Sequence, residues 1–175
     1  QGQKVDLTPP WPRKSLADLF DTFLGLDLLQ LIRNKHVFVK QAKVKNYIVD
    51  EQDNWEDIFY KLFLTHIEPK LGWGAPVFVT DYPVEMAALS KVKKDDTNFA
   101  ERVEFYIGGI ELGNGFSELN DADEQYERLK NERLERKSNG MELYDIDQTF
   151  IDALREGMPE AGGIAVGIDR VIMLI

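Results

Sequence analysis

The stretch RVEFYIGGIEL, residues 102–112, contains the pattern that decides the fold. Val103, Phe105 and Ile107 alternate with polar residues, the period of two that is typical of a half-buried strand. Gly108-Gly109 then supplies two residues that adopt positive φ easily, as the tight turn of a β-hairpin requires. The stretch therefore predicts two antiparallel strands joined at the glycine pair.

This hairpin places two acidic side chains on one face. With the glycines as the turn, Tyr106 lies opposite Glu111, and Glu104 becomes the diagonal neighbour of Glu111. Diagonal neighbours are roughly 7 to 8 Å apart, so two glutamates can converge on one ion. Like charges so placed repel each other unless a positive group lies between them. Mg²⁺ held by carboxylates and nucleotide phosphates is one such group, and a solvated polar face is the alternative.

The C-terminal stretch GGIAVGIDRVIMLI, residues 162–175, reads as a strand rich in glycine followed by the start of an apolar helix. Glycine lets a backbone approach a flat ligand closely, although it also marks tight packing. Arg170 at the start of the helix adds fixed positive charge beside a polyphosphate. Taken with the hairpin, this stretch favours a nucleotide site.

The rest of the chain predicts mainly helices. Helical periodicity covers residues 15–24, 27–33, 53–70, 121–138 and 146–156, while 76–80 reads as a short buried strand. We expect Trp55, Phe59 and Phe63, which recur at helical spacing in 53–70, to lie in the core. Residues 91–97 are charged and predict a solvated surface loop.

Composition narrows the classes of function. The 175 residues are 43% hydrophobic, which suits one globular domain with its own core. The chain has no cysteine, which excludes disulfides and thiolate sites. Its net charge of −10 argues against a nucleic-acid partner bound by this segment and for a small-molecule or protein partner. No apolar run approaches the roughly 18 residues that span a bilayer, so we expect no membrane partner and a cytoplasmic location.

Three segments carry a family resemblance. Residues 167–170, GIDR, resemble the third signature motif of class II aminoacyl-tRNA synthetases, and residues 114–121, NGFSELND, resemble the lysine-binding segment of the lysyl type. Residues 8–14, TPPWPRK, resemble a stretch that follows the second motif. The resemblance implies an α+β fold in which an antiparallel sheet of five or six strands is flanked by helices. It also implies that residues 1–175 are one domain, the C-terminal portion of a catalytic domain with motif 3 present and motifs 1 and 2 absent, so we expect an incomplete site that is inactive alone.

Two members of the lysyl group compete. Three features resemble the elongation factor P β-lysine ligase: Ala165 where the synthetase usually has glycine, residues 86–90 without the usual proline, and residues 146–159. The resemblance therefore implies activation of lysine or β-lysine by ATP as an adenylate, followed by transfer to a lysine of elongation factor P. The alternative is a lysyl-tRNA synthetase that acts on tRNA(Lys), and the non-enzyme alternative is a ligand-binding module or scaffold. A homodimer is implied for the full-length parent.

The resemblance also implies roles for individual residues, with ATP and Mg²⁺ as cofactors. The implied metal ligands are Glu104 and Glu111; ATP lies beside Glu111, Leu112, Gly167 and the catalytic Arg170; the substrate lies against Asn114, Phe116, Glu118 and Ala165. The charge of Glu118 suits its role, because a buried ammonium needs a charged partner. Acids also favour helix N-termini, so Glu118 has a structural alternative.

Overall fold

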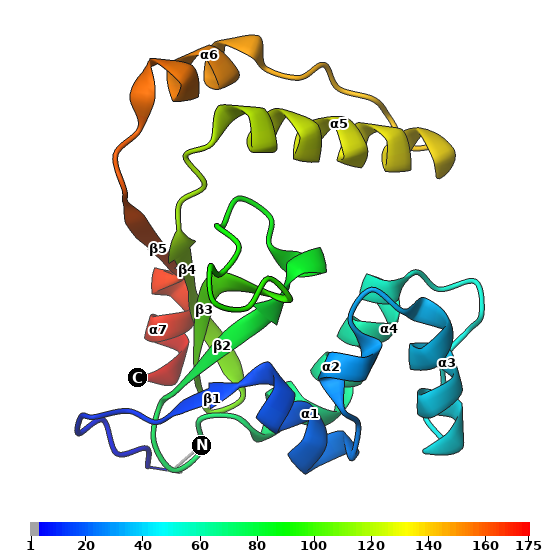
Figure 1. Cartoon of the computed structure of the whole chain (residues 1–175). Coiled ribbons are helices and arrows are strands. Elements are labelled where there is room, and N and C mark those ends of the chain that lie inside the picture. Colours follow the sequence, from blue (N-terminus) through cyan, green and yellow to red (C-terminus); the bar gives the residue numbers. More distant parts are fainter. Residues whose placement is uncertain (1–3) are drawn as a thin grey trace.

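The computed structural model describes residues 4–175 and combines a sheet with flanking helices, an α+β arrangement (Figure 1). The strands are β1 (Arg13–Ser15), β2 (Val77–Pro83), β3 (Phe99–Ile107), β4 (Ile110–Ser117) and β5 (Gly162–Val166). The helices are α1 (Leu16–Leu24), α2 (Leu28–Leu31), α3 (Lys35–Val44), α4 (Trp55–Leu62), the π-helix η1 (Phe63–Ile67), the 3₁₀ turns η2 (Glu68–Lys70) and η3 (Val84–Met86), α5 (Ala122–Ser138), α6 (Gln148–Gly157) and α7 (Ile168–Leu174).

The described strands form one sheet in the order β1-β2-β3-β4-β5. β1 runs parallel to β2, and the other three pairings are antiparallel. Five strands agree with the predicted number, whereas the parallel pair differs from the expected fully antiparallel sheet. That pair arises because α1 to α4 connect β1 to β2, and a parallel connection needs such a crossover.

The β3–β4 hairpin has the predicted turn, and Gly108-Gly109 adopts φ angles of 60° and 76°. Tyr106 lies opposite Glu111, as expected. The register then shifts by one residue at a β-bulge on β4, so Glu104 lies directly opposite Asn114. Periodicity predicts strand pairing without a bulge. It misses this one because a bulge adds one residue to one strand and leaves the alternation on the other strand unchanged.

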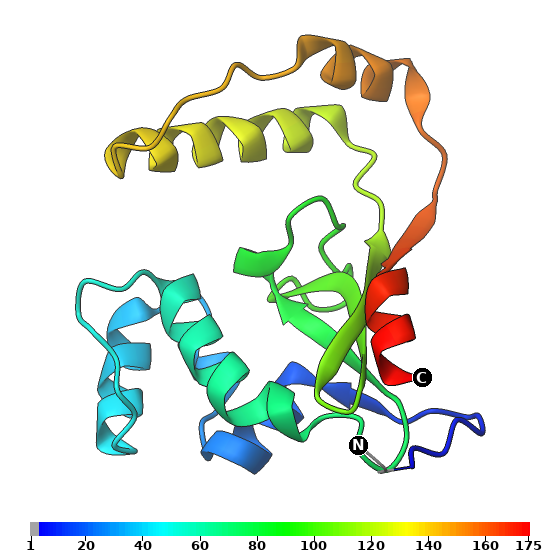
Figure 2. The same ribbon diagram turned by 180° about the vertical axis from the view of Figure 1, so that it is seen from behind.

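The main core lies between the sheet and helices α1 to α4, at one end of the molecule (Figures 1 and 2). Phe59 is fully buried, and its ring centroid lies 5.0 Å from that of Phe20, 5.5 Å from Trp55 and 5.6 Å from Phe63. Offset rings at these separations pack favourably. The prediction that Trp55, Phe59 and Phe63 are core residues is confirmed, whereas Tyr60 in the same stretch is 40% exposed.

Helix α3 was not predicted. Its residues Val37, Phe38 and Val39 are consecutive, which hides the helical spacing, and only Phe38 and Ala42 are buried, four residues apart. The start of the helix is fixed locally, because the Asn34 side chain accepts a hydrogen bond from the Val37 N–H at 3.1 Å.

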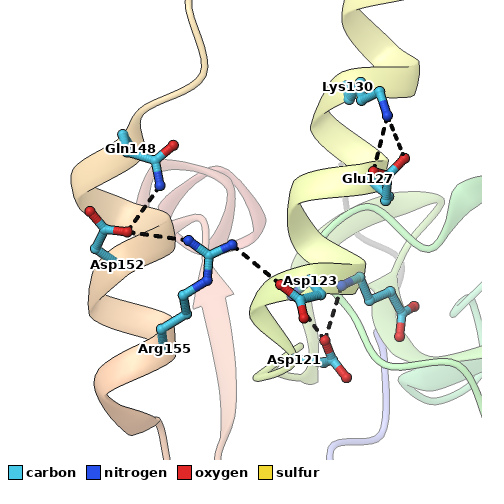
Figure 3. A network of polar contacts seen from close by, with 8 residues as sticks. Asp121, Asp123, Glu127, Lys130, Gln148, Asp152 and Arg155 are labelled. Carbon is cyan, nitrogen blue, oxygen red and sulfur yellow. Dashed lines mark hydrogen bonds and ion pairs between the residues drawn. The ribbon is translucent and has the colours of Figure 1, made fainter.

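Helices α5 and α6 form an arm, residues 122–157, inserted between β4 and β5 and projecting away from the sheet (Figures 1 and 2). The arm has its own small cluster of buried residues, Ala122, Ile151 and Leu154. Figure 3 shows Arg155 reaching from α6 to Asp123 on α5, 3.3 Å away. Exposed pairs of this kind contribute little, so the apolar cluster holds the two helices together.

The segment 91–97 is a loop in which Lys94, Asp95 and Thr97 are exposed, as we expected, but two of its lysines form ion pairs. Lys91 pairs with Glu160 just before β5, and Lys93 pairs with Asp81 on β2 at 2.8 Å. Sequence alone shows a run of charges but not their partners, which lie 69 and 12 residues away. Within residues 4–175, no helix combines the length and the apolarity that crossing a membrane demands.

Candidate functional site

One face of β3, β4 and β5 collects most of the predicted site residues. Residues that lie directly opposite each other on neighbouring strands project to the same face. The pairing therefore makes two rows across the three strands, the first Glu104, Asn114 and Ala165, the second Arg102, Phe116 and Gly163. Six side-chain positions from three separate segments thus share one surface.

Glu104 is almost fully buried on this face, at 6% exposure. Arg102 Nη2 donates to its Oε1 at 2.7 Å, and the Tyr106 hydroxyl donates to its Oε2. Burial raises the pKa of Tyr106, and the negative charge of Glu104 raises it further, so the phenol stays protonated and acts as a donor. Burial alone would lower the pKa of Arg102, but Glu104, Tyr82 and Tyr60 together raise it above its ordinary value. The carboxylate is thus held in one orientation by two donors.

Glu111 also has an arginine partner. Arg170 Nη1 donates to the backbone oxygen of Glu111 at 2.7 Å and lies 3.4 Å from its Oε2. Two glutamates that share a strand face repel each other unless a positive group lies beside them. In this structure Arg102 meets that requirement for Glu104 and Arg170 meets it for Glu111, so the carboxylates alone do not demand a metal ion.

The four residues predicted to lie beside ATP come together where α7 begins. Gly167 N donates to Leu112 O at 2.8 Å, which fixes the start of α7 against β4. The Leu112 side chain is buried, so its backbone is the part that faces the junction. Arg170 remains half exposed at 51%, and a guanidinium has five N–H donors, so it keeps donors for a phosphate.

Glu118 lies over the neighbouring strand β5. A Cβ built on Gly163 would lie 2.8 Å from Glu118 Oε1, which places the carboxylate directly above that glycine. The structural alternative for Glu118 is wrong, because the cap of α5 is Asp121, which accepts from the N–H groups of Asp123 and Glu124 at 3.0 Å. Glu118 therefore has no role at the helix start.

Two further residues of the site were not predicted from the sequence. Arg102 precedes Glu104 by two positions, and only the strand spacing could have indicated that they share a face. Glu68 lies in η2, which packs against the hairpin turn. Because η2 contacts β4, Glu68 is a third acid near this end of the site. Burial raises the pKa of Glu68, and the charges of Glu111 and Glu104 raise it further.

The donor set suits Mg²⁺ only with help from a ligand. Within the described range 4–175, no three His, Cys, Asp or Glu residues form a cluster that could hold a metal. Glu111 and Glu104 offer hard carboxylate oxygens, and Mg²⁺ is commonly held by one or two carboxylates together with phosphate oxygens. Glu111 is the more accessible of the two, since its side chain is 31% exposed.

Comparison with known proteins gives consistent matches. Residues 2–175 match the protein family described as tRNA synthetases class II (D, K and N). The chain is 41% identical over 177 residues to a lysine–tRNA ligase of Pelotomaculum thermopropionicum, covering 100% of the chain and 34% of the relative. It is 37% identical to the lysine–tRNA ligases of Chloroflexus aurantiacus and Listeria welshimeri, covering 100% and 98% of the chain and 35% and 34% of the relatives.

The chain thus spans about a third of the length of these relatives. These relatives are named lysine–tRNA ligases, so they support the lysyl-tRNA synthetase alternative better than the elongation factor P ligase that we expected. The α+β sheet with its flanking helices agrees with the class II catalytic fold. The chain therefore belongs to the class II aminoacyl-tRNA synthetases of the D, K and N group.

Proposed function

We propose that this chain forms part of the site at which a lysine–tRNA ligase makes lysyl adenylate from lysine and ATP. The observation that supports this proposal most directly is that the row Glu104, Asn114 and Ala165 lies on the same sheet face as the Glu111–Arg170 pair. The names of the relatives support lysine as the substrate and tRNA(Lys) as the acceptor.

In this proposal a carboxylate oxygen of lysine forms a bond to the α-phosphorus of ATP, and the bond from that phosphorus to pyrophosphate breaks. Arg170 binds phosphate oxygens from the start of α7 and stabilises the negative charge that develops there. Glu118 binds the side-chain ammonium of lysine, while Phe116 and Ala165 shape the pocket. When bound at Glu104 and Glu111, Mg²⁺ would neutralise phosphate charge. Positioning and charge neutralisation supply the rate, since no covalent catalysis is asked of the protein.

Elongation factor P β-lysine ligase is the second candidate, and Ala165 is the observation that favours it. Ala165 lies directly opposite Asn114, in the first row of the site. One additional methyl group in a pocket changes selectivity by roughly 1 to 3 kcal/mol, which is enough to favour an amine displaced by one carbon. The acceptor would then be a lysine of elongation factor P.

Calorimetry on the 175-residue chain tests the proposal. Two non-hydrolysable probes, the sulfamoyl adenosine analogues of the α-lysyl and (R)-β-lysyl adenylates, are titrated in the presence of Mg²⁺. We expect heat from the α-lysyl probe, loss of at least tenfold in affinity for Glu118→Gln, and no change for the control Glu132→Gln on α5. Preference for the β-lysyl probe would replace the first candidate by the second. No heat from either probe would leave a scaffold and refute both.

A further inference from the structure

We propose that Arg102 is a positioning residue of this site. It holds the carboxylate of Glu104 and turns the amide of Asn114 so that the Nδ2 donors face the oxygens of a bound carboxylate or phosphate. The identity of that ligand as an aminoacyl adenylate rests on the proposed function, while the positioning itself rests on the contacts below.

Arg102 is rigidly held. Its side chain is 11% exposed, and Nη1 donates to the backbone oxygen of Met86 at 2.8 Å. Its guanidinium carbon lies 4.6 Å from the centroid of the Tyr82 ring, a cation–π contact. A guanidinium fixed by a carbonyl on one edge and a ring on one face has little freedom, so the contacts made by its other donors have a fixed direction.

Those other donors reach two residues that lie opposite each other in the sheet. Arg102 Nη2 donates to Glu104 Oε1 at 2.7 Å, and Arg102 Nε donates to Asn114 Oδ1 at 3.3 Å. Glu104 and Asn114 are direct partners in the β3–β4 register. One side chain thus sets the orientation of both members of the row.

The contact with Arg102 decides whether the oxygen or the nitrogen of the Asn114 amide faces a bound ligand. An amide side chain carries acceptors on its oxygen and two donors on its nitrogen. Because Oδ1 accepts from Arg102, Nδ2 points the other way, and in the described part of the chain no protein group accepts from it. The next residue of the row is Ala165, whose side chain is small and exposed. Two open N–H donors on this face match an oxyanion.

Lysine cannot replace arginine in this role. Its single ammonium cannot contact Met86, Glu104 and Asn114 from the directions that the planar fork uses. Arg128 provides a control on α5 outside the site. Like Arg102 it donates to the backbone, in its case to the oxygens of Ala88 and Ser90 at 2.8 Å, and it pairs with a glutamate.

The experiment uses the 175-residue chain, the α-lysyl sulfamoyl adenosine probe and ¹⁵N NMR. We expect Arg102→Lys to weaken probe binding at least tenfold, and Arg128→Lys to leave it within twofold. Asn114→Asp keeps the oxygen that accepts from Arg102 but loses the donors, so it should keep the thermal midpoint and lose at least tenfold in affinity. The double variant should lose little more than either single variant, because Arg102 acts through the Asn114 donors that the second change removes. Solvent exchange of the Arg102 Nε–H should be at least tenfold faster in Asn114→Ala than in the unchanged chain.

Unchanged probe affinity in Arg102→Lys overturns the positioning role. If that variant does not fold, Asn114→Asp decides the matter, because unchanged affinity there shows that Nδ2 does not face the ligand. If the unchanged chain itself fails to bind the probe, the proposed function is refuted separately. The exchange measurement then still tests the contact, and equal exchange rates with and without the Asn114 side chain overturn it.

Discussion

Gly163 and Glu118 fit each other across the β4–β5 boundary, since a Cβ built on Gly163 would lie 2.8 Å from Glu118 Oε1. Gly163 has no positive φ that would require glycine. The position instead gives room to a carboxylate, because real Cβ atoms do not approach oxygen so closely. Gly163 on β5 therefore decides where the acid that we assign to the substrate ammonium can lie.

Gly163→Ala is expected to displace the Glu118 carboxylate and to weaken binding of the α-lysyl sulfamoyl adenosine probe about tenfold, because an ion pair with a lysine ammonium depends on close approach. Calorimetry measures the change. The matched control is Gly162→Ala, where the nearest atom, Phe116 O, is 3.5 Å from the built Cβ. Equal affinity in the two variants would show that Glu118 does not need this position.

Gly72→Ala is expected to destabilise the fold by about 3 kcal/mol or more. Gly72 has a φ of +73°, and its Cβ would lie 2.5 Å from the backbone oxygen of Tyr106. Gly72 O also accepts from Gly108 N at 2.9 Å, so the change disturbs the hairpin turn. Thermal unfolding checks the effect against Gly74→Ala, whose Cβ has no neighbour within 4 Å.

The pair Lys91–Glu160 predicts a dependence of stability on pH. The hydrogen bond from Lys91, and then its charge, lower the pKa of Glu160 below 4.5. The pair therefore stabilises the fold above pH 4.5, and that contribution is lost as the pH falls through the folded-state pKa. The melting difference between the unchanged chain and Glu160→Gln should be positive at pH 7 and vanish in acid. A difference that stays constant with pH would contradict the ion pair, and Glu156→Gln serves as an exposed control.

Ile151→Ala is expected to lower the free energy of unfolding of the arm by about 2 to 5 kcal/mol, because Ile151 is fully buried in its small cluster. Arg155→Ala should cost less than about 1 kcal/mol, since its pairs with Asp123 and Asp152 are exposed. Hydrogen exchange of the α5 and α6 amides measures both effects on the stability of the arm separately from the stability of the sheet. The reverse order would mean that the network in Figure 3 holds the arm.

The 175-residue chain is expected to self-associate through β5. This strand pairs only with β4 in the described sheet. Its own residue Ile164 is 54% exposed, and the α7 residues Ile168 and Ile172 are 65% and 63% exposed. Edge strands with exposed apolar side chains pair with other chains. Ile164→Lys should lower the sedimentation coefficient at high concentration, whereas Ile48→Lys, at a site remote from the sheet edge, should not.

Much of the hairpin could be predicted, because alternation and a glycine pair are local signals. The turn and the Tyr106–Glu111 pairing follow from them directly. The bulge could not be predicted, since one extra residue on β4 leaves the pattern of β3 unchanged. Its effect on the site is large, because it brings Asn114 rather than Gly113 opposite Glu104.

The partners of the charged residues were the least predictable part. Sequence shows that Glu104 and Glu111 share a face, but it does not show that each has an arginine. Arg170 lies 59 residues from Glu111 in the chain, a separation at which local patterns carry no information. Lys91 illustrates the same point, because a lysine in a charged run has many potential partners and only folding selects Glu160.

The arm that separates β4 from β5 has a consequence for the order of folding. The β3–β4 hairpin closes a two-residue turn, whereas β5 can pair with β4 only after the segment 118–161 has brought its ends together. The entropy lost on closing a loop grows with its length, and contacts distant in sequence form later. We therefore expect Glu104, Glu111 and Asn114 to be assembled early, and Ala165, Gly167 and Arg170 to join them in a slower, final step of folding.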